Sequence, residues 1–160
     1  MFCWGNPSFP PVLPTNSGRK RLNILGAYNP ADHSLVHITG EENCNADRIL
    51  QLFDIIIRSY PDAPEIHLIA DNAKYFLAGK VSEWLGNNKK SDIHFLPPYA
   101  PNLNLIERLW GFVKEKVAGN KYYEKYKTFR AEVFGLINNL DQHKNKLITL
   151  MTEKFEIIHA

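Results

Sequence analysis

A run of strand length near the middle of the chain, IHLIA at residues 66–70, limits the folds that this protein can adopt. Such continuous apolar runs are typical of strands buried on both faces, which occur in sheets with helices packed on each side. Asp71 follows the run directly, so a carboxylate closes the predicted strand. The run therefore predicts an α/β domain in which Asp71 stands at the edge where open sheets bind their ligands.

Apolar periodicity on either side of this strand predicts the remaining elements. Alternating segments around the turn-prone sequence NPADH predict an antiparallel hairpin, and spacings of three and four residues predict helices. In chain order we expect strands at 22–28 and 34–39, a helix from Asn45 to Pro61, the strand at 66–70, a helix at 74–87, a strand at 93–96, a helix carrying the stripe from Ile106 to Val117, and helices at 122–140 and 143–157. This order is typical of a layered α/β domain, a mixed sheet flanked by helices.

The chain of 160 residues is long enough for one sizeable core, and its 44% apolar residues favour a globular protein. Residues 1–20 are rich in Pro, Asn, Ser and Gly and are expected to be irregular. Residues 21–120 carry the α/β pattern, and residues 121–160 are expected to form a helical extension.

Cysteine content and hydropathy indicate the cellular compartment in which the protein is expected. Cys3 and Cys44 fit neither a metal-binding spacing nor a disulfide framework, which favours a reducing environment. No apolar run has the length of a membrane span, and the N-terminus lacks a signal-peptide pattern. The sequence thus predicts a protein of the cytoplasm with no membrane partner.

The charge is small overall but unevenly distributed. The net charge is +2, yet residues 108–130 hold seven basic side chains and two acidic ones, so this segment carries +5 and the rest of the chain −3. A basic segment can hold phosphates, and it can also be an ordinary solvated helix face. The charge alone does not distinguish these two interpretations.

Asp71 and Glu107, with 35 residues between them, are the candidate catalytic acids, and each also has a simpler interpretation. Asp71 and Asn72 could serve only as turn residues where the strand ends. The sequence from Asn104 to Glu107 fits a helix N-cap followed by an acid at the third helical position, in which case Glu107 would only satisfy backbone donors. Neither acid alone is specific.

Together, the two acids point to divalent-metal chemistry. Phosphodiester hydrolysis and strand transfer use two divalent ions, held by clustered carboxylates, to activate the nucleophile and stabilise the leaving oxygen. Hard oxygen ligands favour Mg²⁺ or Mn²⁺. After Glu107 on the same predicted helix, Gly111 leaves room for a substrate backbone, and Lys114 could meet a phosphate. A strand-end Asp and a helix-start Glu can converge on such a site.

Three segments carry a resemblance to a known family: LIADNA at 68–73, LPPYAPNLNLIERLWGFVKEK at 96–116 and RLNILGAYNP at 21–30. They resemble the catalytic domain of mariner-superfamily transposases, especially those of bacterial insertion sequences. The second block is highly specific, and the resemblance covers essentially the whole chain. It implies a ribonuclease H-like fold, and an enzyme that cuts double-stranded DNA at the element's ends and joins them to target DNA.

The resemblance also implies roles for individual residues. Asp71 and Glu107 would be the second and third metal ligands, with Mg²⁺ or Mn²⁺ as the cofactor. Phosphate contacts are expected from Lys114, Lys116, Lys121 and Arg108. The loop that presents Glu107 would be shaped by Asn72, Pro97, Pro98, Tyr99, Asn102 and Asn104. The histidines of the strand-like runs are expected to be packed or edge residues and not ligands: His37, His67 and His94.

The family's first metal-binding Asp has no counterpart in this sequence. In the family it ends a central strand that precedes a Trp-containing loop, which FCWG at residues 2–5 resembles. The other aspartates lie in predicted turns, on helices or before a strand, and none closes an apolar strand. The resemblance therefore implies a catalytic domain that lacks its first central strand, and we expect the chain alone to be inactive or nearly so.

Three hypotheses follow. The first is an incomplete DDE transposase, a DNA-acting protein of the bacterial cytoplasm associated with the nucleoid. The second is a non-catalytic remnant that binds DNA through its basic helices, or that pairs with a second copy or with an intact transposase. The third is a purely structural α/β module in which Glu107 is a helix cap.

Overall fold

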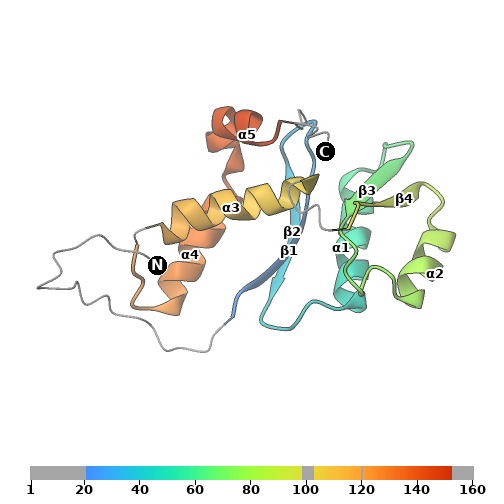
Figure 1. The fold of residues 1–160 in the computed structure, drawn as a ribbon, viewed down its shortest axis with the longest axis horizontal. Coiled ribbons are helices and arrows are strands. Elements are labelled where there is room, and N and C mark those ends of the chain that lie inside the picture. The colour runs from blue at the N-terminus through green and yellow to red at the C-terminus, as the bar shows by residue number, and fades with distance from the viewer. Residues whose placement is uncertain (1–20, 99–102, 120, 153–160) are drawn as a thin grey trace, which may run out of the picture.

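The computed structural model describes residues 21–98, 103–119 and 121–152 (Figure 1). Tyr99 and Asn102 of the predicted loop lie outside the described residues. Strands come early in the chain and helices dominate its second half. The elements are β1 (Asn23–Tyr28), β2 (Leu35–Gly40), α1 (Ala46–Ser59), β3 (Ile66–Ala70), α2 (Gly79–Asn87), β4 (Ser91–Phe95), α3 (Leu105–Ala118), α4 (Tyr126–Ile137), the 3-10 helix η2 (Leu140–His143) and α5 (Lys144–Leu150).

The strands form two separate pairs. β1 and β2 are antiparallel, with Tyr28 opposite Leu35 at the turn, as the hairpin pattern predicts. β3 and β4 are parallel, and α2 makes the crossover between them. Among the described residues, no hydrogen-bonded ladder joins the two pairs, so the mixed α/β fold contains two small sheets and not one.

Helices cover both faces of the β1–β2 pair (Figure 1). One face packs on α1 through side chains such as Leu25 and Ile38. The opposite face packs on α3 and its neighbours through side chains such as Ile24 and Leu35. Alternate residues of each strand point to opposite faces, so this hairpin forms the middle of a three-layer arrangement.

The prediction that the strand at 66–70 is buried on both faces is wrong. Ile66 and Leu68 pack towards α1, but His67 lies on the other face and is exposed, and Ile69 is 65% exposed. The reason is that α3 packs on β1, whereas no described helix covers this second face of β3 and β4. β3 is therefore a strand with one buried face. Because Ile69 on the exposed face is apolar, the sequence does not show the alternation of apolar and polar residues that is typical of such a strand.

Two predicted helix boundaries differ from the structure. The helix expected at 74–87 begins at Gly79, because residues 73–77 form turns that bond Phe76 N–H to the carbonyl of Ala73. The helix expected at 122–140 is shorter and is followed by η2 and α5. Residues 153–160 of the last predicted helix lie outside the described residues.

The helices after residue 120 share a core with α3. Its fully or nearly fully buried members include Leu109, Phe112, Val133 and Leu147. The division of the chain at residue 120 stays a prediction, but the buried contacts run across it. None of the described helices has the length and hydropathy needed to cross a membrane.

Gly26 allows α3 to approach β1 closely. A Cβ atom at this position would lie 3.0 Å from Cδ1 of Leu35 and 3.2 Å from Cζ2 of Trp110. Trp110 belongs to α3, so the absence of a side chain at Gly26 sets how near this helix lies to the hairpin.

We expect Gly26→Val to destabilise the protein by about 1–3 kcal/mol, because a branched side chain overpacks the contact with Trp110. The free energy of unfolding measured in urea would show this loss. Gly135→Ala is the matched control, since a Cβ there meets nothing within 4 Å and a helical Gly→Ala change is not destabilising. Equal stability of Gly26→Val and the parent protein would contradict this account of the packing.

Candidate active site

A cleft of about 570 Å³ lies between β1, the end of β3 and α3. Asp71 and Glu107 both line it, although they come from distant parts of the chain. The hairpin contributes one wall, and the helices α3 and α4 contribute another. The lining residues that the argument uses are Leu22–Gly26, Cys44, Ile69–Asp71, Tyr75, Glu107 and Lys114. The structure therefore brings the two predicted acids to one cavity.

Asp71 follows the last residue of β3 and is exposed. Its Oδ1 accepts a hydrogen bond of 3.1 Å from the backbone N–H of Ala73, which is an Asx-turn. The turn interpretation of Asp71 is thus correct as far as it goes. One oxygen shapes the turn, and the carboxylate as a whole still lines the cleft.

Glu107 lies in the first turn of α3 and is also exposed. Asn104 is the N-cap residue of this helix, but its side chain makes no capping hydrogen bond. The reciprocal capping box predicted as the simpler interpretation is therefore not formed by Asn104. Glu107 is held in place by its backbone, whose N–H donates to the carbonyl of Asn104 at 3.1 Å.

The loops after β3 and β4 are tied together beside Asp71. Nδ2 of Asn72 donates to the carbonyl of Leu96 at 2.7 Å, and the N–H of Leu96 donates to the carbonyl of Ala70 at 2.9 Å. Pro97 and Pro98 follow and are exposed, whereas Asn104 is only 8% exposed. Asn72 thus fixes the start of the segment that leads to Glu107.

Tyr75 and Cys44 belong to this cleft, and the sequence did not point to either. Burial raises the pKa of Tyr75 to about 12, and Cys44, Asp71 and Glu107 add to the rise. Burial also raises the pKa of Cys44, which shares a hydrogen bond with Tyr75. Both carboxylates thus raise the pKa of the Tyr75 hydroxyl, which supports the conclusion that they lie in the same cleft. No local motif marks Tyr75, because its place depends on the turn before α2.

The predicted phosphate-binding residues have different surroundings. Lys114 is exposed and lines the cleft with the two acids. Lys116 lies 6.0 Å from the ring centroid of Phe112, and Nζ of Lys121 is 4.0 Å from Glu132. Nη1 of Arg108 donates to the backbone carbonyls of Leu150 at 3.3 Å and Thr152 at 2.9 Å, so it ties α3 to the end of α5.

The chemistry of Asp71 and Glu107 fits a divalent cation, since carboxylate oxygens are the ligands that Mg²⁺ and Mn²⁺ prefer. Within the described ranges, three or more candidate ligand atoms lie within 4.8 Å of one another only at His67, Asp92 and His94. That group stands on the exposed face of β3 and β4. Neither Asp71 nor Glu107 belongs to a group of three such atoms among the described residues.

The Tyr75 hydroxyl reports on the two acids. We expect Asp71→Asn and Glu107→Gln each to lower the pKa of Tyr75 from about 12, because each substitution removes a negative charge that disfavours the phenolate. An NMR titration with tyrosine labelled at Cζ measures this value. Glu115→Gln, an exposed acid further along α3, is the control and should leave it unchanged. A Tyr75 pKa insensitive to both cleft acids would contradict their convergence.

Comparisons with known proteins identify the family of this chain. Residues 4–130 match the family described as DDE superfamily endonuclease. A protein of Shigella sonnei, the insertion element IS630 uncharacterized 39 kDa protein, is 24% identical over 106 residues, which are 66% of this chain and 31% of that protein. The chain thus spans about a third of this relative's length.

The fold resembles the Mos1 transposase in its paired-end complex with the left transposon end. The TM-score is 0.60 at 15% identity, over 98% of this chain and 52% of that one. This likeness supports the fold of a transposase catalytic domain. With the family match and the insertion-element relative, it confirms the resemblance to mariner and IS630 transposases, and the chain belongs to the DDE superfamily endonuclease family.

Proposed function

We propose that this chain is the catalytic part of a transposase, which cleaves DNA at the ends of an insertion sequence and joins them to target DNA. One observation carries the proposal: a strand-end Asp and a helix-start Glu from distant segments line the same cleft with an exposed lysine. Membership of the DDE endonuclease family and the insertion-element relative support it.

In this proposal Asp71 and Glu107 hold the divalent metal, Mg²⁺ or Mn²⁺. A bound metal pair would supply activation of the attacking oxygen and charge stabilisation at the leaving oxygen. The protein's own part is to place the two carboxylates. The turn at Asp71, the bond from Asn72 to Leu96 and the packing of α3 on β1 fix their positions.

Double-stranded DNA is the proposed substrate, and Lys114 is the favoured phosphate contact because it lines the cleft beside the acids. Lys116 and Lys121 are exposed and extend the positive charge along the surface of the chain. Arg108 is a weaker candidate, since its guanidinium already bonds to the end of α5. The chain would act on the DNA of the bacterial nucleoid.

A further strand, ending in the family's first metal-binding Asp, is proposed to enter the cleft between β1 and β3. Each of these strands pairs on one edge only among the described residues, and both border the cleft. An unpaired strand edge is a template for another strand. Such a strand would join the two pairs into one ribonuclease H-like sheet and place an acid beside Asp71 and Glu107.

The alternative is a catalytically inactive remnant that binds DNA, or that pairs with a second copy or with an intact transposase. The absence of a third ligand close to Asp71 and Glu107 in the described part of the chain favours it. Two carboxylates alone should hold Mg²⁺ poorly.

The DNA sequence upstream of the Met1 codon distinguishes the catalytic part of a transposase from an inactive remnant. We expect it to encode, in this frame or an adjacent one, an apolar strand ending in Asp. Protein that includes this segment should cleave element-end DNA with Mg²⁺. Asp71→Asn and Glu107→Gln should each slow cleavage at least about a hundredfold, because a metal contributes several kcal/mol to the transition state.

The matched controls for this experiment are Asp62→Asn and Glu115→Gln, exposed acids outside the cleft lining, which should cleave at the parent rate. Stop codons or unrelated sequence upstream would establish the remnant. Unchanged cleavage by Glu107→Gln would remove this residue from the proposed metal site.

We expect Lys114→Ala to weaken DNA binding about equally for all sequences, because a phosphate contact carries no base information. The slope of log affinity against log salt concentration should fall by about 1. Fluorescence anisotropy with labelled duplexes measures both. Lys80→Ala is the control, because the parent side chain pairs with Asp47 and does not line the cleft. An unchanged salt slope for Lys114→Ala would exclude the phosphate contact.

A further inference from the structure

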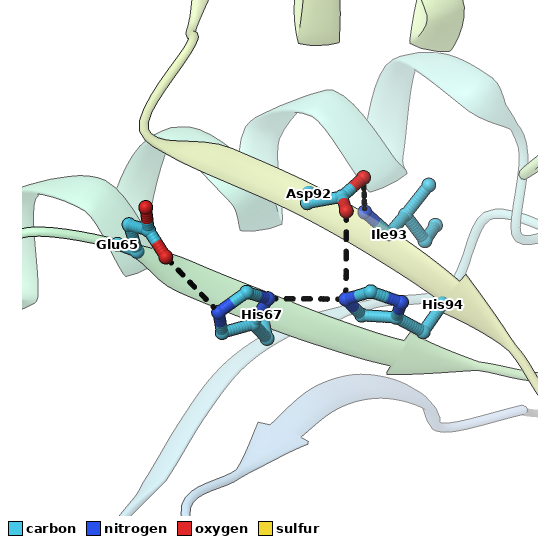
Figure 2. A network of polar contacts seen from close by, with 5 residues as sticks. All are labelled: Glu65, His67, Asp92, Ile93 and His94. Carbon is cyan, nitrogen blue, oxygen red and sulfur yellow. Dashed lines mark hydrogen bonds and ion pairs between the residues drawn. The ribbon is translucent and has the colours of Figure 1, made fainter.

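The parallel pairing of β3 and β4 gathers two histidines and an aspartate on the exposed face of this sheet. His67 is opposite Asp92 in the register, and Ile69 is opposite His94. Residues two apart on a strand share a face, so His67, Asp92 and His94 project from the same side. Figure 2 shows the three side chains converging above the two strands.

The distances in this cluster are close to those of a ligand set, with a hydrogen bond joining the two histidines. Nδ1 of His67 is 3.0 Å from Nε2 of His94, and Oδ2 of Asp92 is 3.5 Å from the same Nε2. Ligands at about 2.0–2.2 Å from a tetrahedral metal lie roughly 3.3–3.5 Å apart. All three ligand atoms lie within 4.8 Å of one another, so small side-chain movements bring them to one ion.

Two further contacts orient these ligands. Oε2 of Glu65 is 3.4 Å from Nε2 of His67, the ring nitrogen that faces away from His94 (Figure 2). Metal-bound histidines commonly donate their other N–H to a carboxylate, which fixes the tautomer. Oδ1 of Asp92 accepts from the backbone N–H of Ile93 at 2.9 Å, and its Oδ2 is the oxygen nearer His94.

We propose that His67, His94 and Asp92 form a Zn²⁺ site, with Glu65 as a positioning residue. Imidazole nitrogen and carboxylate oxygen suit zinc, whereas Mg²⁺ prefers oxygen ligands throughout. Three protein ligands on an exposed surface leave the fourth position to water. This site is separate from the pair Asp71 and Glu107, and it does not rest on the proposed transposase activity.

A bound ion would cross-link β3 to β4. The carboxyl ends of these strands carry Asp71 and the segment from Leu96 towards Glu107. The backbone ladder and the bond from Asn72 to Leu96 also join the two strands. Zinc would thus fix the β3–β4 register from the exposed side, beside the cleft.

Zn²⁺ titration of the full purified chain, in competition with a chromophoric chelator, tests the proposal. We expect one saturable site that millimolar Mg²⁺ does not displace. His67→Gln and His94→Gln should each lower the zinc affinity by more than tenfold, because each removes a ligand. Glu65→Gln should lower it by about tenfold, the usual effect of losing an orienting carboxylate.

Matched substitutions outside the cluster provide the controls. His143→Gln, Glu83→Gln and Glu107→Gln should keep the parent zinc affinity, and circular dichroism should show every variant folded. Unchanged zinc affinity in Glu107→Gln would show that this site is independent of the cleft. The zinc proposal therefore stands or fails separately from the transposase proposal. Absence of saturable zinc binding, or equal affinity in the parent and both histidine variants, would overturn the proposal.

Discussion

The apolar face of α1 holds together two pairs of strands that share no backbone ladder among the described residues. Its buried side chains, such as Ile49 and Phe53, belong to one apolar cluster, and side chains of both pairs pack against this cluster. Packing of this kind lacks the directional register of hydrogen bonds, so the distance between the pairs is set by side-chain volume. The cleft between β1 and β3 exists because α1 spans both pairs from one side only.

The two candidate acids depend on different contacts. Asp71 is placed by β3, which packs on α1, whereas Glu107 is placed by α3, which packs on the opposite face of the hairpin through Trp110 and Gly26. Asn72 ties the loop after β3 to the carbonyl of Leu96, which follows β4. The geometry of the cleft therefore reflects packing on both faces of β1 and β2, and not the local sequence around either acid.

Sequence patterns located most elements to within a few residues, because apolar periodicity reports directly on burial. The hairpin, α1, β3, β4 and α3 all appear where periodicity placed them. The start of α2 and the exposure of Ile69 could not be predicted, since both depend on which helix covers which face. The neighbourhood of His67 and His94 was also missed. It arises from the register between two strands, whose histidines are 27 residues apart in the sequence, and no local spacing encodes this register.

The contact between Gly26 and Trp110 has a consequence for the order of folding. The hairpin closes over a short turn, whereas Trp110 must reach Gly26 across a loop of more than 80 residues. Closing a long loop costs entropy before its contacts compensate, so α3 should dock late. A newly synthesised chain would then hold Asp71 in place before Glu107 arrives. The carboxylates would remain apart until the fold is nearly complete, and the proposed metal site would form only in the last folding step.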